Sequence, residues 1–272
     1  MKKLLLLFLF VAQCACAATV VPISVRPGNH MPLVSVSLDG KSATLILDTG
    51  ASHTTFDMEF VTNSFPGATL VDPLMVGTSN VETPPKFMPA KRLAVGGRDI
   101  QVDGVMALDL SHLDRSVGCN IDGILGMDVL RPTRFVLSLA RSELVFVDKP
   151  SEVRQGFVRI PSRLDSSGCY ELLATLPDGS TRPMLLDSGS SFTFLSGTNS
   201  WPLASASSTL SSSDVNGRAP MDFLQGALAP LALGQTNVVL APLMVDAPIN
   251  RLGSDFLLLA DLLHVPGHIF IR

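Results

Sequence analysis

The sequence predicts a mainly β protein in which one chain carries two duplicated β lobes. Three observations lead to this prediction: an ungapped internal repeat, alternating apolar and polar residues within each copy, and turn residues between the alternating stretches. The chain has 272 residues, of which 46% are hydrophobic and 16% are charged. A chain of this length and composition folds as one large domain or as two of ordinary size.

The repeat relates residues 33–56 to residues 172–195 without a gap. Each copy contains an apolar pair, an aspartate, a hydroxyl residue and a glycine, at residues 46–50 and again at 185–189. Further along, GILGMDVL at 123–130 matches NRLGSDFL at 250–257. Two aspartate turns, each followed by Leu-Gly-x-Asp-x-Leu in the same order, are not expected by chance. The repeat therefore predicts an N-terminal lobe over residues 18–149 and a C-terminal lobe over 150–272.

Period-2 patterning makes each copy β-rich. Residues 33–38 alternate as a strand does, Asp39-Gly40 is typical of a hairpin turn, and residues 43–47 form the returning strand. Residues 92–109 predict further strands around a turn at Gly96-Gly97.

Helix signals are few, and loop signals separate the copies. Helices are predicted at Met127–Leu130 and at its counterpart in the second copy, and Ser254–Leu263 is a further candidate. The polar residues 148–156 are expected to be the linker, and the serine-rich residues 205–213 are expected to be a mobile loop.

The first 17 residues have the pattern of a secretory signal. Lys2 and Lys3 precede an apolar run, and Ala15-Cys16-Ala17 is a small-residue cleavage site, so cleavage is predicted after Ala17. The alternatives are a buried first element or a lipoprotein attached at Cys14. The run is too short to span a membrane. We therefore expect a periplasmic or secreted protein with no stable membrane association after the signal is removed.

Two cysteines, Cys119 and Cys169, remain after the signal. An even count in an oxidising compartment predicts a disulfide between them, and two separate buried thiols are the alternative.

The aspartate turns together with the downstream glycine motifs resemble those of aspartic proteases in the bacterial retropepsin-like or pepsin-like group. The glycine motifs are Leu125-Gly126 and Leu252-Gly253. This resemblance implies a bilobal pepsin-like fold of two retropepsin-like β-barrel lobes with a cleft between them. It also implies a monomer without a cofactor that binds extended peptides or unfolded proteins.

The resemblance assigns catalysis to Asp48 and Asp187. Two carboxyl groups held close together cannot both ionise, so they share a proton, and the ionised member can take a proton from a water between them. The resemblance further implies that the hydroxyls of Thr49 and Ser188 hydrogen-bond across the two lobes. Gly50 and Gly189 would allow both unusual backbone angles and a close approach of the two loops.

Three features depart from the family pattern. Ser190 occupies the place of Ala51 in the first copy, and its hydroxyl is expected to bond Asp187 and favour its charged form. Arg251 stands where the family has an apolar residue. The family's flap tyrosine is missing, so the flap would be a hairpin at Val76, Gly77, Thr78 and Ser79, unless this is an ordinary surface hairpin.

Other functions receive little support from the sequence. The formal net charge of −4 and the lack of a basic run make nucleic acid an unexpected partner. His264 and His268 are separated by Pro266-Gly267, which breaks the helix that a metal site at this spacing would need, so no metal is predicted. The main alternative function is a non-catalytic periplasmic peptide-binding protein that retains the duplicated fold. An enzyme active only in a larger assembly is the second alternative.

Overall fold

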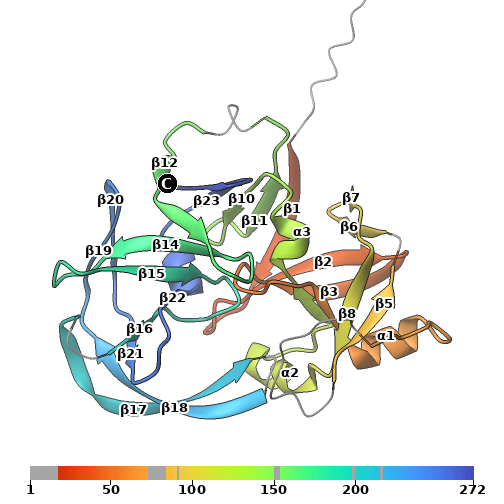
Figure 1. The fold of residues 1–272 in the computed structure, drawn as a ribbon, viewed down its shortest axis with the longest axis horizontal. Helices are drawn as coiled ribbons and strands as arrows, with labels where there is room; N and C mark the ends of the chain where they lie inside the picture. The colour runs from red at the N-terminus through yellow and green to blue at the C-terminus, as the bar shows by residue number, and fades with distance from the viewer. Residues whose placement is uncertain (1–17, 73–83, 91, 150–153, 198–199, 215–216) are drawn as a thin grey trace, which may run out of the picture.

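The computed structural model describes residues 18–72, 84–90, 92–149, 154–197, 200–214 and 217–272, and these residues form a mainly β structure with curled sheets (Figure 1). The predicted signal peptide at 1–17 lies outside the described residues, as does the predicted flap at 76–79. Among the described helices, none has the length and apolar character required to cross a membrane.

The first half of the chain contains eleven described strands and three described helices. The strands are β1 (Thr19–Val25), β2 (Pro32–Leu38), β3 (Lys41–Leu47), β4 (Thr55–Asp57), β5 (Lys86–Pro89), β6 (Leu93–Val95), β7 (Arg98–Ile100), β8 (Gly104–Leu108), β9 (Gly123–Leu125), β10 (Phe135–Ser138) and β11 (Glu143–Phe146). The helices are α1 (Met58–Ser64), α2 (Ser111–Val117) and α3 (Met127–Leu130).

The described part of the second half continues with strands and one short helix. The strands are β12 (Val158–Ile160), β13 (Ser162–Leu164), β14 (Tyr170–Thr175), β15 (Thr181–Leu186), β16 (Phe194–Ser196), β17 (Leu203–Asp214), β18 (Gly217–Gly226), β19 (Ala229–Leu233), β20 (Thr236–Leu240), β21 (Leu243–Val245), β22 (Arg251–Leu252), β23 (Leu262–Val265) and β24 (His268–Ile271). The helix is α4 (Ser254–Leu257).

The predicted first hairpin is confirmed, because β2 and β3 pair antiparallel around a two-residue turn. Asp39 and Gly40 have φ values of 45° and 85°. Positive φ at both turn residues matches the right-handed twist of the two strands, and aspartate followed by glycine tolerates it well. After this hairpin, β3 pairs in parallel with β9, so the end of β3 lies beside the first glycine motif.

Corresponding strands of the second half pair in the same way. β14 and β15 form the antiparallel hairpin, and β15 pairs in parallel with β22. β16 is parallel to β21 and antiparallel to β22, just as β4 is parallel to β8 and antiparallel to β9. The segments that repeat in sequence therefore also repeat their strand pairing.

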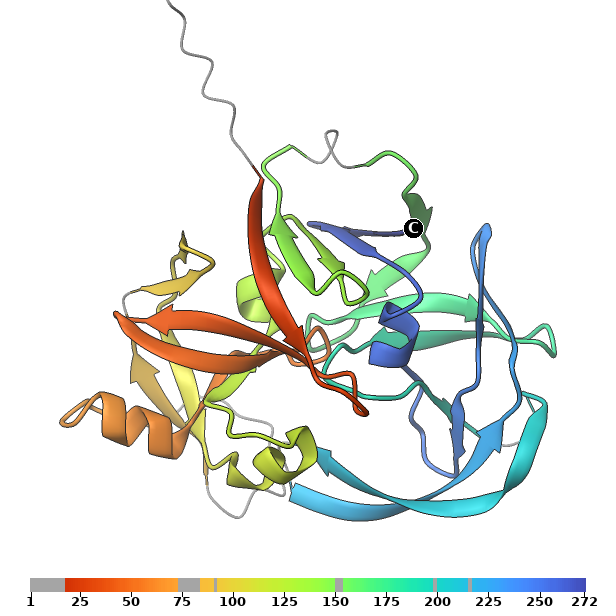
Figure 2. The ribbon, with the colours of Figure 1, turned by 180° about the vertical axis from the view of Figure 1, so that it is seen from behind.

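Strands from both ends of the chain share one sheet. The order is β12-β24-β23-β10-β11-β1, after which β1 continues into the sheet of β2 and β3. Both views show β23 beside β10, close to the C-terminus (Figures 1 and 2). The largest cluster of buried apolar side chains likewise contains residues of both halves, such as Leu47 and Leu125 with Leu186 and Leu252.

The structure corrects three expectations about local elements. Helices α1 and α2 were not predicted, although Asp57 caps α1 through its side chain and Gly118 ends α2 with a left-handed φ of 79°. The possible helix along Ser254–Leu263 is wrong beyond Leu257, because the chain leaves α4 for strand β23.

The serine-rich residues 205–213 form part of β17 and are not a loop. They pair with β18 in a long hairpin that reaches α2 of the first half (Figure 2). The ladder supplies backbone partners, so pairing overrides the weak strand preference of serine. Cross-strand contacts such as Thr209 Oγ1 to Asp222 Oδ1, at 2.6 Å, support it.

Candidate active site

Two aspartates lie at the ends of equivalent strands and are held by equivalent backbone hydrogen bonds. Asp48 follows β3, and its N–H donates to Leu125 O at 3.0 Å. Asp187 follows β15, and its N–H donates to Leu252 O at 2.9 Å. Each Leu-Gly motif therefore anchors the aspartate of its own half.

The two aspartates meet across the halves, each facing the other's glycine. A Cβ atom at Gly50 would lie 2.5 Å from Asp187 Cγ, and one at Gly189 would lie 2.3 Å from Asp48 Oδ2. Neither glycine has a positive φ. The expectation of unusual backbone angles is therefore wrong at these positions, and close approach alone requires glycine.

Four hydrogen bonds cross between the two aspartate turns. Thr49 Oγ1 donates to Leu186 O at 2.8 Å and accepts from Ser188 N–H at 3.0 Å. Ser188 Oγ donates to Leu47 O at 2.7 Å and accepts from Thr49 N–H at 3.0 Å. Both hydroxyls are buried. Each hydroxyl thus uses its donor and acceptor capacity on the opposite half, which fixes the register of the two turns.

A second set of polar contacts lies behind each turn. In the first half, Thr54 Oγ1 donates to Asp128 Oδ1 at 2.7 Å and accepts from Gly126 N–H at 3.0 Å. The second half has the same arrangement, in which Thr193 binds Asp255 at 2.8 Å and Gly253 N–H at 3.2 Å. The sequence reasoning assigned these residues no role, although the threonines and aspartates recur in both copies. They tie each glycine motif to its aspartate turn.

Burial of the pair raises the pKa of Asp48 to about 8. Desolvation of the carboxylate is the largest cause, and the negative charge of Asp187 acts in the same direction. Hydrogen bonding with Asp187 also favours the protonated form, whereas the N–H of Gly50 and the positive charge of Arg251 oppose it. Asp48 therefore keeps its proton near neutral pH.

Asp187 has an ionic partner that Asp48 lacks. Arg251 Nη1 lies 3.0 Å from Asp187 Oδ2. The expected bond from Ser190 to Asp187 is not formed, because Ser190 Oγ donates instead to Phe192 O at 2.9 Å. Arg251 therefore contacts the carboxylate of Asp187, and the expectation that Ser190 bonds Asp187 is corrected.

The structure contradicts the predicted disulfide, since Cys119 and Cys169 are both free thiols. Cys169 is buried beside the first turn, where its Sγ donates to Gly50 O at 3.4 Å. Cys119 instead packs against a separate apolar cluster that includes Leu113 and Val117 of α2. Each cysteine is placed by its own surroundings, so the even count that suggested a bridge is not a guide to pairing.

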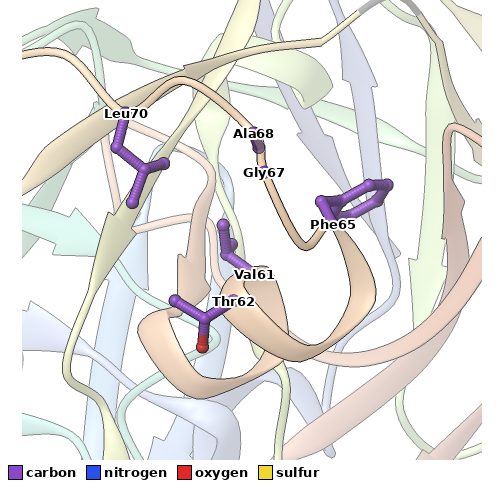
Figure 3. A pocket seen from close by; sticks show the side chains of 6 residues that line it. All are labelled: Val61, Thr62, Phe65, Gly67, Ala68 and Leu70. Atoms are coloured by element: carbon purple, nitrogen blue, oxygen red, sulfur yellow. The ribbon is translucent and has the colours of Figure 1, made fainter.

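A small cavity of about 100 Å³ lies away from the aspartates, beside α1 (Figure 3). It is lined by Val61, Thr62, Phe65, Gly67, Ala68 and Leu70. None of these is an aspartate-turn or glycine-motif residue, so the cavity does not mark the candidate active site. The predicted flap residues Val76, Gly77, Thr78 and Ser79 lie outside the described part of the chain.

Within the described residues, no group of three or more His, Cys, Asp or Glu side chains is arranged to hold a metal ion. His264 is fully buried in the shared sheet and stacks on Phe135, and His268 is exposed and lies beside Arg159. The arrangement at the aspartate turns is instead suited to acid and base catalysis by two unlike carboxyl groups.

A comparison with protein families matches residues 34–129 to the family described as aspartyl protease. The matched segment contains the first aspartate turn and the first glycine motif. No curated protein matches the chain. The match confirms the resemblance to aspartyl proteases that the sequence shows, and it supports a protease-type function at the level of that family.

Proposed function

We propose that the protein is an aspartic endopeptidase in which Asp48 and Asp187 activate one water molecule for attack on a peptide bond. The observation that carries this proposal is the meeting of the two carboxyl groups, each against the other's glycine, with the pKa of Asp48 raised to about 8. A pair with one protonated and one ionised member supplies both a general acid and a general base.

The proposed reaction needs no covalent intermediate. The ionised carboxylate takes a proton from water as the water oxygen bonds to the peptide carbonyl carbon. The protonated carboxyl group gives its proton to the carbonyl oxygen, which forms a neutral tetrahedral diol. When the C–N bond breaks, the amine receives the proton taken from water, and a diol hydroxyl returns its proton to the other carboxylate. One water is consumed and the pair regains its starting state.

The two-lobe organisation is part of the proposal. Repeated strand pairing and the mirrored contacts of Thr54 and Thr193 support two pepsin-like lobes at 18–149 and 150–272, with an extended peptide bound between them. We propose that the chain acts as a monomer. Its signal peptide would be cleaved after Ala17, and the protein would be secreted or periplasmic. The supporting roles proposed for Thr49, Gly50, Ser188, Gly189 and the two Leu-Gly motifs follow from their contacts with the aspartates.

A cleavage assay with two aspartate-to-asparagine substitutions tests the proposal. Purified protein is incubated with unfolded peptides from about pH 3 to 7, a range set by the titration of such carboxyl pairs, with and without pepstatin. Asp48→Asn and Asp187→Asn should each reduce cleavage by at least about 100-fold, because each removes one proton-transfer group. Asp72→Asn, which changes an exposed aspartate paired with Lys86, is the matched control.

The outcome separates the proposed enzyme from a binding protein. Cleavage that Asp72→Asn retains and both active-site variants lose would support the endopeptidase. Peptide binding without cleavage by the unmodified protein would instead favour the non-catalytic alternative.

A further inference from the structure

Arg251 brings a positive charge to one member of the aspartate pair. It lies on β22, opposite Leu185 of β15, directly before the second Leu-Gly motif. Its Nη1 is 3.0 Å from Asp187 Oδ2. The side chain of Asp187 is 6% exposed and that of Arg251 is 34% exposed, so the pair lies at the edge of the buried site.

This ion pair differs from the surface pairs of the described chain. The acidic side chains of the other described pairs are 12% to 82% exposed, and exposed pairs contribute little because solvent screens them. Arg251 Nε is buried without a hydrogen-bond partner. Its contact with Asp187 acts on a carboxylate that water reaches poorly.

The position in the first half that corresponds to Arg251 carries no charge. The two glycine motifs are 127 residues apart (253 minus 126), which places Ile124 where the second half has Arg251. Ile124 is 3% exposed and packs in an apolar cluster. The two halves thus match in their backbone contacts and differ in charge, because a cation faces Asp187 and an isoleucine occupies the corresponding place behind Asp48.

We propose that Arg251 is a positioning residue that assigns the two roles within the pair, holding Asp187 as the ionised base and leaving Asp48 as the proton-carrying acid. This inference rests on the proposed function and specifies its first step. Water gives its proton to Asp187 while its oxygen bonds to the carbonyl carbon, and the proton of Asp48 moves to the carbonyl oxygen. If Asp48 were the ionised base and Asp187 the acid, the negative charge would lie on the carboxyl group that Arg251 does not contact.

The described charged and titratable groups around Asp187 are consistent with this assignment. They are Asp48 across the pair, Arg251 on β22 and the thiol of Cys169. Burial raises the pKa of the Cys169 thiol to about 11, so that group stays neutral wherever the pair titrates. Arg251 is thus the described cation that lies beside the single negative charge of the pair.

The pH dependence of cleavage tests the role of Arg251. In Arg251→Met the charge is lost and much of the aliphatic chain is kept, so the acid limb of kcat/KM should move up by about one pH unit, as expected for a carboxylate that loses an adjacent cation. On that limb the activity should fall about ten-fold, and much less near neutral pH. Arg251→Lys keeps the charge and should restore most of the shift. Arg163→Met, which removes an exposed arginine of the same half, should leave the profile unchanged.

Two results would overturn the proposal: a uniform loss of activity at every pH, and a gain of activity in Arg251→Met, which would make the ion pair inhibitory. The thermal unfolding midpoint of each variant shows whether it is folded. If the unmodified protein shows no cleavage that depends on Asp48 and Asp187, the proposed function fails on its own. The role of Arg251 is then still tested by ¹³C NMR titration of the aspartate carboxyl carbons. If the proposal is right, the titration midpoints must differ between the unmodified protein and Arg251→Met.

Discussion

The buried imidazole of His264 should make the folded state lose stability as the pH falls. His264 lies on β23, stacks on Phe135 at a ring separation of 4.9 Å and has no exposed surface. Its Nδ1 is 2.9 Å from Thr133 O, which can only accept, so Nδ1 carries the proton. Nε2 then accepts from the hydroxyl of Tyr170 at 3.3 Å. The neutral imidazole satisfies both partners.

The magnitude follows from the pKa of His264, which burial lowers from 6.5 to about 4. Between these two values the unfolded chain binds a proton that the folded protein does not bind, so the free energy of unfolding decreases as the pH falls. A difference of about 2.5 pKa units corresponds to about 3 kcal/mol. The contribution is fully present above pH 6.5 and is lost once the pH is below about 4.

Asp48 acts in the opposite direction over the whole of this range. Its pKa is raised in the folded protein, so the folded state gains stability relative to the unfolded chain as the pH falls. The two proteins to be compared should therefore both carry Asp48→Asn, which removes this titration and the proposed endopeptidase activity together. One of the two also carries His264→Gln.

Urea unfolding at intervals from pH 3.5 to 7.5 measures the effect. The free energy of unfolding of the protein with His264 should fall by about 3 kcal/mol more than that of His264→Gln across this range. The readout is the change in the free energy of unfolding with pH. A loss of stability that the substitution causes equally at every pH does not affect it. His268→Gln alters an exposed histidine on the adjoining strand and serves as the matched control. Parallel pH curves for the proteins with and without His264 would refute the reasoning.

Two further predictions concern the surroundings of the aspartate pair. Gly50→Ala places a Cβ 2.5 Å from Asp187 Cγ, so the carboxyl group must move by about 1 Å, and kcat/KM should fall about 100-fold; activity equal to that of the unmodified protein would contradict the close approach. The Cys169 thiol should resist iodoacetamide in the native protein at pH 8, because it is buried and burial raises its pKa to about 11. Mass spectrometry after unfolding without reductant should then find both cysteines alkylated, and labelling only after reduction would instead reveal a disulfide.

Local patterns in the sequence predicted the first hairpin and the positions of both aspartates along the chain, but not strand β17. The hairpin of β2 and β3 was predictable because alternation and an Asp-Gly turn act within a few residues. Helix α1 was missed because its seven residues give a weak periodic signal, and its Asp57 cap is equally typical of a loop.

Features that depend on side-chain direction could not be predicted. The Ser190 hydroxyl lies three residues from Asp187 in sequence, yet it bonds Phe192 O. Arg251 was noted only as a departure from an apolar position, because its distance from Asp187 depends on the parallel pairing of β22 with β15. The free state of Cys119 and Cys169 likewise depends on the separation of two packed regions.

The hydrogen bonds exchanged by Thr49 and Ser188 make each aspartate turn depend on the other half of the chain. Neither turn can complete its own hydrogen bonding, since each buried hydroxyl finds its carbonyl acceptor on the other half of the chain. A chain whose second half is still unfolded therefore holds an inert aspartate and no water-activating pair. The proposed proteolytic activity therefore requires both halves of the chain to be folded. An incompletely folded chain would be inactive without any inhibitor.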